Sequence, residues 1–275
     1  MRRLIISALL LLGIGFGVLA YAFGQARADP VVRRATIALP DWPRGAASVR
    51  VVLLSDIHIG SLAMDAGRLT RIVAQVNALR PDLVLIAGDF VYGHDPRRGV
   101  RFAAELGTPL AGLRSRLGTI AVLGNHDWWN GEPAVRAQLA RAGIAVVENG
   151  AVTRWPLAIA GIGDEYTDHD RIGAAMAAVR RLPGARLVLT HSPDLVPRLP
   201  PDARLVLAGH THCGQVSLLG WTPGPQPYAP RYRCGIIREH GRAIVVGAGV
   251  GASVAPIRFG VPPDLWLLTL GPAAA

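Results

Sequence analysis

Lysine is absent from this sequence, and cysteine occurs only twice, as Cys213 and Cys234. Two cysteines exclude a disulfide framework, and their spacing excludes a Cys-x-x-Cys metal knuckle. They leave the redox compartment of the protein open. Internal repeats and low-complexity tracts are absent as well, so a chain of 275 residues with 51% hydrophobic content folds as one large domain or two small ones.

Because lysine is absent, all 29 basic residues are arginines, and they exceed the 19 acidic residues to give a formal net charge of +10. Such a charge suits an anionic partner, such as a phosphate, a nucleic acid or a lipid headgroup surface. A genome-wide preference for arginine would produce the same excess. The charge alone therefore selects no partner.

The N-terminus contains the longest hydrophobic run, 20 residues without charge at positions 4–23. This run is long enough to span a bilayer as a helix, and Arg2 and Arg3 precede it, so residues 1–28 are predicted to be a signal anchor. The small-x-small pattern at 26–28 keeps a cleaved signal peptide as an alternative. The two arginines favour a single-pass protein whose remaining chain lies on the extracytoplasmic side, although Arg27, Arg33 and Arg34 reduce the charge asymmetry.

Downstream, short apolar runs alternate with amphipathic stretches, which predicts an α/β sandwich in which both faces of the sheet are covered. The runs predict strands at 49–56, 82–89, 119–125, 157–164, 186–191 and 204–210, with further strands at 243–249 and 265–270. Helical periodicity predicts helices at 68–79, 100–117, 132–142 and 171–182.

Five of the first six predicted strands end in a residue that can bind a metal ion: Asp56, Asp89, Asn125, His191 and His210. Ligands of open α/β sheets bind beyond the carboxyl ends of the strands, so these side chains are expected to meet in one site. Imidazole, carboxylate and amide ligands without thiolate suit catalytic Mn, Fe, Zn or Ni. Two such ions, about 3.5 to 4 Å apart, suit displacement at phosphorus, with Asp89 as the carboxylate that bridges them.

The order of motifs, D-x-H, G-D, G-N-H-D, H and G-H-x-H, resembles the calcineurin-like metallophosphoesterase superfamily over residues 31–270. Within it, GHTHCGQ, YRCG and PIRFGVPPD resemble membrane-associated bacterial phosphodiesterases. The resemblance implies a four-layer α-β-β-α sandwich with two mixed sheets flanked by helices. It also implies a linker and first edge strand at 29–48, a catalytic domain at 49–271, and hydrolysis by a hydroxide that bridges two divalent ions.

The resemblance implies a role for each motif residue. The first ion would be bound by Asp56, His58 and His212, and the second by Asn125, His191 and His210, with Asp89 between them. His126 would donate a proton to the leaving oxygen or stabilise the transition state as a cation, and Asp127 would orient its imidazole by a hydrogen bond.

The H-x-H pair has a geometric explanation in an extended segment, where His210 and His212 would project to the same side while Thr211 points away. Gly209 and Gly214 would allow the backbone to approach the site closely. The family usually has glycine where this sequence has Cys213. We interpret Cys213 as a small buried residue.

Several residues outside the motifs have two readings. Arg231, Arg233 and Arg258 are predicted to lie at the rim, where they would bind phosphate or only keep the surface soluble. The acidic residues at 164–170 are interpreted as a solvated loop with a helix N-cap. Trp128 and Trp129 would contact a leaving group or an acyl chain, or would pack the loop over the core. His94, His169 and His240 are assigned no role.

The leading hypothesis is a membrane-anchored phosphodiesterase that uses two divalent ions and acts on a lipid-linked or cell-envelope substrate. One concrete candidate is UDP-2,3-diacylglucosamine, whose nucleotide would require the cytoplasmic side. A nuclease is ranked lower, because the arginines are scattered and no aromatic platform accompanies them. A non-catalytic metal-binding scaffold is disfavoured by the presence of His126 and Asp127. The physiological substrate, the identity of the ions and the oligomeric state stay open.

Overall fold

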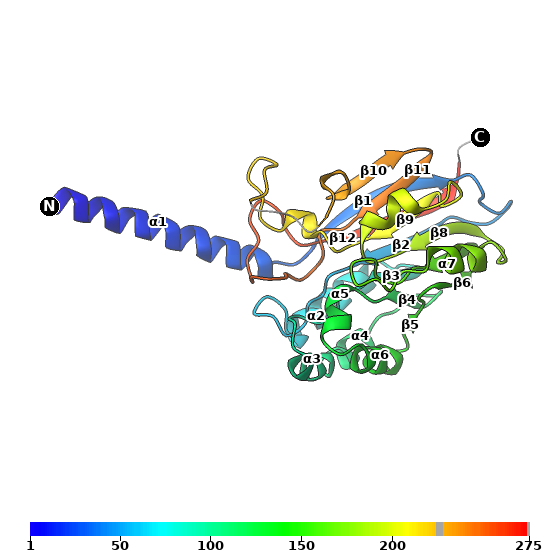
Figure 1. The fold of residues 1–275 in the computed structure, drawn as a ribbon, viewed down its shortest axis with the longest axis horizontal. Coiled ribbons are helices and arrows are strands. Elements are labelled where there is room, and N and C mark those ends of the chain that lie inside the picture. Colours follow the sequence, from blue (N-terminus) through cyan, green and yellow to red (C-terminus); the bar gives the residue numbers. More distant parts are fainter. Residues whose placement is uncertain (224–227, 274–275) are drawn as a thin grey trace.

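The computed structural model describes residues 1–223 and 228–273, and within them two six-stranded sheets pack face to face (Figure 1). The first sheet has the order β1 (Val31–Leu39), β12 (Asp264–Pro272), β2 (Val49–Leu54), β3 (Leu83–Ala87), β4 (Thr119–Val122), β5 (Ala145–Val146). The second sheet has the order β10 (Gly235–Glu239), β11 (Arg242–Val246), β9 (Leu205–Ala208), β8 (Ala185–Leu189), β7 (Leu157–Gly161), β6 (Gly150–Arg154).

Both sheets are mixed. In the first sheet β2, β3, β4 and β5 run parallel, while β12 runs antiparallel to β2. In the second sheet β11, β9, β8 and β7 run parallel, and β10 and β6 pair antiparallel with its two ends. Because the central strands are parallel, their carboxyl ends gather at one end of the sandwich.

Helices cover the outer face of each sheet, which explains why the central strands are apolar along their whole length. The helices of the sandwich are α2 (Ala66–Ala78), α3 (Pro96–Ala103), α4 (Gly107–Leu110), α5 (Asn125–Trp129), α6 (Glu132–Arg141) and α7 (Ile172–Val179), with 3-10 turns η1 (Pro193–Arg198), η2 (His212–Gly214) and η3 (Pro230–Tyr232). Helix α1 (Arg2–Arg27) precedes them and covers neither sheet. Alternate residues of one strand face opposite layers. Leu53 of β2 packs between the sheets, whereas Val52 packs under the helices. The predicted four-layer sandwich is confirmed.

One predicted helix was wrong. In place of one helix at 100–117 the chain has two short helices, α3 and α4, and no helix after residue 110 in this stretch. Helix α3 begins earlier, at Pro96, where the Asp95 side chain accepts a hydrogen bond from the Arg97 amide. Pro109 has no amide hydrogen and cannot continue a helical ladder, and α4 ends one residue later.

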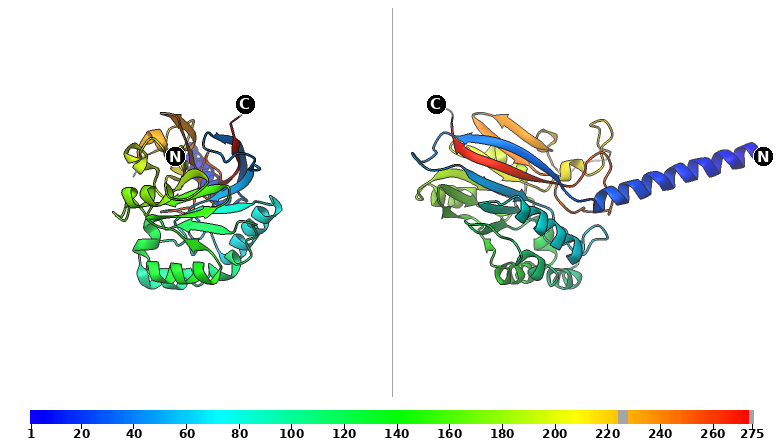
Figure 2. Two further views of the ribbon diagram at one scale, coloured as in Figure 1. Left: turned by 90° about the vertical axis from the view of Figure 1, so that its right-hand side faces the viewer. Right: turned by 180° about the vertical axis from the view of Figure 1, so that it is seen from behind.

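The helix α1 is long and apolar enough to cross a membrane, with a mean hydropathy of 2.4 in its most apolar window. It projects from one end of the sandwich, and the C-terminus lies at the other end (Figure 2). Only Ala22 and Ala26 of α1 are buried. Ala26 packs against Ala63 and Ala252, so the base of α1 contacts loops at the carboxyl ends of the strands.

Candidate metal centre

The predicted ligands converge at the end of the sandwich where the parallel strands finish. Asp56 follows β2, Asp89 follows β3, Asn125 begins α5 after β4, His191 follows β8 and His210 follows β9. The nine predicted ligand and catalytic residues are all buried: Asp56, His58, Asp89, Asn125, His126, Asp127, His191, His210 and His212. Both sheets contribute, so the site forms only when the two sheets pack together.

One group of candidate ligand atoms comes from Asp56, His58 and His212. The Nε2 atoms of His58 and His212 lie 3.1 Å apart, and Nε2 of His212 lies 3.5 Å from Oδ1 of Asp56. The Nδ1 atom of His58 faces the carbonyl of Val91 at 3.3 Å, which turns Nε2 inward.

A second group comes from Asn125, His191 and His210. The Oδ1 atom of Asn125 lies 3.0 Å from Nε2 of His191 and 3.0 Å from Nδ1 of His210, and the two nitrogens lie 3.2 Å apart. The other ring nitrogen of His191, Nδ1, donates to the carbonyl of Ala87 at 2.7 Å, which turns Nε2 toward the amide oxygen.

Asp89 lies between the two groups. Its Oδ2 atom is 3.4 Å from Nε2 of His58 in the first group and 3.4 Å from Nε2 of His191 in the second. Its other oxygen, Oδ1, accepts a hydrogen bond from the amide of His126 at 2.9 Å. One carboxylate therefore faces both groups, as a bridging ligand requires.

These residues fit a pair of divalent ions. Ligands at about 2.1 Å from an ion lie roughly 3.0 Å from one another in octahedral geometry and roughly 3.4 Å in tetrahedral geometry. The distances within both groups fall in that range, 3.0 to 3.5 Å. The donor chemistry agrees, because the Asn125 oxygen only accepts and Nε2 of His191 can bind a cation in place of its proton, so an ion would join the two atoms.

Burial shifts the pKa values of these groups strongly. Burial, with a contribution from the Asp89 charge, raises the pKa of Asp56 to about 7. Burial lowers the pKa of His58 to about 3 and holds the pKa of His212 well below its ordinary value, so both rings are neutral, the form that binds metals. Burial also opposes ionisation of Asp89, but the charges of His191 and His126 hold its pKa well below the usual range.

The backbone at the site has conformations that L-residues rarely adopt. Asp56, Asp89, His210 and His212 have φ values of 53°, 57°, 70° and 48°. Such strain persists only where the surroundings enforce it, and it clusters at functional sites. A Cβ atom added to Gly209 would lie 2.6 Å from Oδ2 of Asp56, so the expected close approach of the backbone at Gly209 is confirmed.

The geometric explanation of the H-x-H pair was wrong. His210 and His212 both have left-handed φ values, and Thr211 between them is right-handed helical, so the segment is a tight turn. Both histidines nevertheless line one pocket. The Thr211 hydroxyl points away and donates to the carbonyl of Arg233 at 2.6 Å.

His126 is held by the loop that follows β3. Its Nδ1 atom lies 2.9 Å from the carbonyl of Gly93. The buried Asn130 side chain fixes that loop, because it donates to the carbonyls of Gly93 and His126 and accepts from the amide of Asp95. This arrangement occupies Nδ1 and leaves Nε2 of His126 for the pocket.

The predicted role of Asp127 as the partner of His126 was wrong. The Asp127 carboxylate accepts hydrogen bonds from the backbone amides of Asp89, Phe90, Val91 and Gly124 at 2.8 to 3.3 Å. Asp127 therefore joins the loop after β3 to the turn before α5. Its contacts position the backbone that carries Asp89. The His126 ring instead forms its hydrogen bond with the carbonyl of Gly93.

A pocket of about 180 Å³ opens over the two ligand groups, and it contains residues that the motifs did not indicate. His94, Trp129 and Tyr166 line it with His126 and His210. The His94 and Trp129 rings stack with centroids 4.5 Å apart, and Tyr166 lies 5.1 Å from the His210 ring. His94 lies five residues after Asp89 in the same loop, which was the available signal. Trp128 turns away and stacks on His169 at 3.5 Å.

Arg258 does not lie at the rim, as predicted, but is completely buried. Its guanidinium donates to the carbonyls of Ala248 and Gly251, and Nη2 lies 3.2 Å from Nδ1 of His212. Burial lowers the pKa of Arg258 to about 10, so the group stays cationic. Because this guanidinium is fully buried and donates to backbone carbonyls, it stabilises the loop after β11 and is not part of the pocket rim.

Arg231 and Arg233 are engaged elsewhere. Arg231 forms an ion pair with Glu239, and Arg233 donates to the carbonyl of Gly220 and the hydroxyl of Thr222, each at 3.1 Å. Neither arginine is among the described residues that line the metal pocket. Substrate binding by these two arginines stays a prediction.

The two cysteines form a disulfide, Cys213–Cys234, which corrects the interpretation of Cys213 as simply a small buried residue. The bridge closes a segment with a sequence separation of 21 residues. Because Cys213 directly follows His212, the disulfide fixes the turn that carries a candidate ligand.

The interpretation of the acidic residues 164–170 was wrong in part. Asp164 is fully buried and accepts hydrogen bonds from the amide and hydroxyl of Thr167 at 2.9 and 2.7 Å. Helix α7 begins after Arg171, without a side-chain cap. Asp164 therefore stabilises the loop that presents Tyr166.

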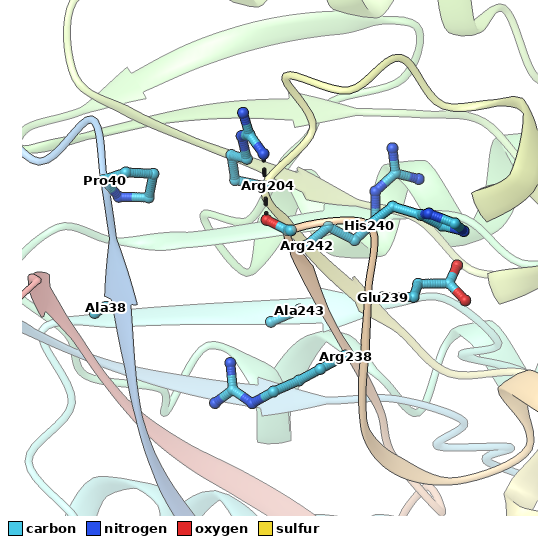
Figure 3. A pocket seen from close by; sticks show the side chains of 9 residues that line it. Ala38, Pro40, Arg204, Arg238, Glu239, His240, Arg242 and Ala243 are labelled. Carbon is cyan, nitrogen blue, oxygen red and sulfur yellow. Dashed lines mark hydrogen bonds between the residues drawn. The ribbon is translucent and has the colours of Figure 1, made fainter.

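A larger pocket, of about 430 Å³, lies at the opposite end of the sheets, where the β10–β11 turn approaches the end of β1 (Figure 3). Arg204, Arg238 and Arg242 line it, and Arg204 donates to the carbonyl of Gly241 at 3.4 Å. Glu239 is the only carboxylate in this lining. Its chemistry is therefore unlike that of the metal pocket.

Comparison with known proteins also identifies phosphoesterases as relatives of this chain. The profile of the family described as calcineurin-like phosphoesterase matches residues 49–214. A "transmembrane protein with metallophosphoesterase domain" of Danio rerio is 31% identical over 87% of this chain and 57% of its own length. An "uncharacterized metallophosphoesterase" of Helicobacter pylori is 28% identical over 98% of this chain and 73% of its own.

Among solved structures, the NAD nucleotidase of Haemophilus influenzae superposes with a TM-score of 0.50 at 18% identity, over 75% of this chain and 46% of that one, which shows the fold. The chain spans about half the length of several relatives it matches, such as the Danio rerio protein and a Caenorhabditis elegans protein at 45%. With the profile match covering most of the two sheets, the chain belongs to the calcineurin-like phosphoesterase family, whose members are metal-dependent phosphoric ester hydrolases.

Proposed function

We propose that this protein is a membrane-anchored phosphodiesterase that uses two divalent ions to hydrolyse a phosphodiester or pyrophosphate bond in a lipid-linked or cell-envelope substrate. The observation that carries the proposal is the position of Asp89, whose Oδ2 atom faces His58 and His191 at the same distance of 3.4 Å. Two separate groups of ligand atoms share this carboxylate, as catalysis at phosphorus by two metal ions requires.

In this proposal Asp56, His58 and His212 hold one ion, and Asn125, His191 and His210 hold the other. Ions held there supply Lewis-acid activation of a phosphoryl oxygen and lower the pKa of water. Mn, Fe, Zn and Ni all suit this mixture of imidazole, carboxylate and amide ligands.

His126 is proposed to hold the proton that the leaving oxygen takes up, or to stabilise negative charge as a cation. The carbonyl of Gly93 accepts from Nδ1 at 2.9 Å, so the ring presents Nε2 to the pocket. Asp127 keeps a supporting role, because its four amide contacts fix the loops that carry Asp89 and His126. For Arg231 and Arg233, the proposal is limited to contacts with the distal part of an extended substrate.

The proposed topology is a single span of a bacterial inner membrane by residues 1–28, followed by the edge segment 29–48 and an extracytoplasmic catalytic domain, 49–271. Helix α1 meets the length and hydropathy of a span. The Cys213–Cys234 disulfide supports the extracytoplasmic side, because disulfides persist in oxidising compartments. The same observation disfavours UDP-2,3-diacylglucosamine, a cytoplasmic substrate.

The nearest test is hydrolysis of bis(p-nitrophenyl) phosphate by the full chain in detergent, with Mn²⁺ added or with the ions removed by a chelator. We expect turnover that disappears with chelation and returns with Mn²⁺. An ion-loaded protein that hydrolyses neither this ester nor a lipid phosphodiester would favour the scaffold alternative. Preferential hydrolysis of DNA or RNA would favour the nuclease alternative.

A further inference from the structure

We propose that the face around the metal pocket docks on the bilayer into which α1 inserts, through an apolar rim formed by Leu62, Leu218, Leu219, Trp221 and Val254. This inference rests on the proposed function in one respect, which is the insertion of α1 into a membrane. It adds the surface that contacts the lipid and the direction in which the pocket opens.

The residues of the apolar rim are large, hydrophobic and exposed. Leu219 is 101% exposed, Val254 is 85% exposed and Trp221 is 66% exposed. Leu218 and Trp221 form a tight hairpin by mutual backbone hydrogen bonds of 2.9 Å, which places Leu219 at the tip. Exposed apolar side chains that gather on one face indicate an interaction surface, and tryptophan is enriched where membranes meet water.

The hairpin is tied directly to the base of α1. The segment before it pairs with Phe259, since the amide of Ser217 donates to the Phe259 carbonyl at 2.8 Å. The Phe259 ring contacts the Tyr21 ring of α1 at 5.7 Å, and the amide of Arg258 donates to the carbonyl of Ala22 at 2.9 Å. Figure 1 and the right view of Figure 2 both show the yellow-gold loop beside the base of α1.

The other two rim residues lie on the same side. Arg27, at the end of α1, donates to the carbonyl of Leu62 and forms an ion pair with Asp65. Val254 lines the metal pocket and lies two residues after Ala252, which packs against Ala26 of α1. Val254 thus connects the mouth of the pocket to the base of the helix.

The length of α1 leaves little space between the membrane and this face. The 18 residues from Leu4 to Tyr21 form about 27 Å of helix, against about 30 Å of hydrocarbon in a bilayer. Contacts with the domain begin at Tyr21 and include the buried Ala22. Strand β1 begins at Val31, so no long tether separates the domain from the helix. The rim is therefore held at the level of the lipid headgroups.

A second copy of the chain, or another protein, is the alternative occupant. The bilayer is favoured because the rim is continuous with α1, whose exposed residues are those of a membrane span. In this orientation the pocket takes phosphoesters whose apolar chains stay in the bilayer while their headgroups reach His126.

The test uses the full chain in vesicles of phosphatidylethanolamine and phosphatidylglycerol. Leu219→Cys and, separately, Val254→Cys carry an environment-sensitive fluorophore, and the native cysteines are protected as a disulfide. The matched control is Ala47→Cys, an exposed position between β1 and β2 at the opposite end of the sheets. The readout is quenching by lipids with a nitroxide near the headgroup.

We expect the labels at 219 and 254 to be quenched about twofold or more, because interfacial insertion brings a side chain about 5–10 Å into the headgroup region. The label at position 47 should be unaffected. If all three proteins float with the vesicles and all three labels are quenched equally little, the docking surface is wrong although the anchor is right. If none floats, the anchor and this inference both fail, while ion-dependent hydrolysis of a soluble ester tests the catalytic proposal separately.

Discussion

The Nε2 atoms of His58 and His212 lie 3.1 Å apart, although 154 residues separate them in the sequence. Each ring is buried, and burial keeps each ring neutral by lowering its pKa. Two neutral imidazoles that face one another beside Asp56 form the proposed site of the first metal ion.

Replacing His212 with Ala should reduce the bound ions from about two to about one per chain and lower turnover at least ~100-fold, because changing a residue that only hydrogen-bonds to a metal ligand already costs about 10–100-fold. Ion content measured by mass spectrometry and hydrolysis of an aryl phosphodiester check this. The matched control is His240→Ala, an exposed histidine in the β10–β11 turn, which should leave both quantities unchanged. Two ions in His212→Ala would contradict the ligand assignment.

His126→Ala should lower kcat by ~10²–10⁴-fold while leaving ion content and thermal stability close to wild type, since proton transfer by a positioned side chain contributes about that factor. The amide of His126, which donates to Asp89, is retained in the variant. Loss of an ion in this variant would instead make His126 a ligand, because its ring also lies in a cluster with His58 and Asp89.

Asp127→Asn should act on stability more than on proton transfer. The carboxylate accepts from four backbone amides, and an asparagine side chain offers one oxygen and an NH₂ group that cannot accept. Leaving buried amides without acceptors should lower the free energy of unfolding by about 1–3 kcal/mol. Thermal unfolding measures this. A shifted pH profile of kcat with unchanged stability would restore the orienting role that the structure opposes.

The ion-free protein should lose stability as pH rises from about 6.5 to about 8. Asp56 keeps its proton in the folded state up to about pH 7, whereas the unfolded chain releases it near 3.8, so the folded state binds more protons. His191, whose pKa is raised by Asp89, loses its contribution in the same direction. Below about pH 6.5, His58 and His212 oppose this trend because they are neutral when folded.

Thermal unfolding of the chelated protein at the two pH values tests the sign. Added Mn²⁺ should stabilise more at pH 8 than at pH 6.5, because ions replace the protons on these ligands. Asp56→Asn should reduce the pH dependence of the ion-free protein. If the stability of the ion-free protein rises over this pH range, the raised pKa values of Asp56 and His191 are wrong.

Breaking the disulfide should destabilise the turn that carries His212. A bridge across 21 residues stabilises by about 3 kcal/mol in the chain-entropy account. The variant Cys213→Ala/Cys234→Ala should lose about that free energy of unfolding and bind the first ion more weakly. Denaturant unfolding is measured for the oxidised protein, the reduced protein and the variant. The oxidised protein should be more stable than either of the other two. Equal stability in all three would show that the turn holds without the bridge.

The sequence was sufficient to predict that the candidate ligands meet in one place, because the parallel strands bring them to one edge. Asp56, Asp89 and His191 each follow a buried apolar run, and parallel strands bring such positions to one edge. The apolar patterning also predicted the layers, since a strand that is apolar on both faces must be covered on both faces.

The partners of individual polar groups could not be predicted in the same way. Arg258 reads as a surface arginine, yet carbonyls of the loop after β11 surround it. Asp127 reads as the neighbour of His126, but the loop after β3, which is distant in sequence, supplies its donors. Cys213 and Cys234 pair because the fold brings two turns together. These contacts arise from packing between segments that are distant in the sequence, so the local sequence pattern does not predict them.

The most direct test of the dinuclear proposal compares wild type with Asp89→Asn in the full chain, because removal of residues 1–28 would delete the contacts of Ala26 and the carbonyl of Ala28 that Arg68 binds. Ion content and hydrolysis of bis(p-nitrophenyl) phosphate are measured on the same samples. The account predicts about two ions per chain and ion-dependent turnover in wild type, with loss of at least one ion and about 100-fold or more of the turnover in Asp89→Asn. Two ions and wild-type turnover in Asp89→Asn would contradict it.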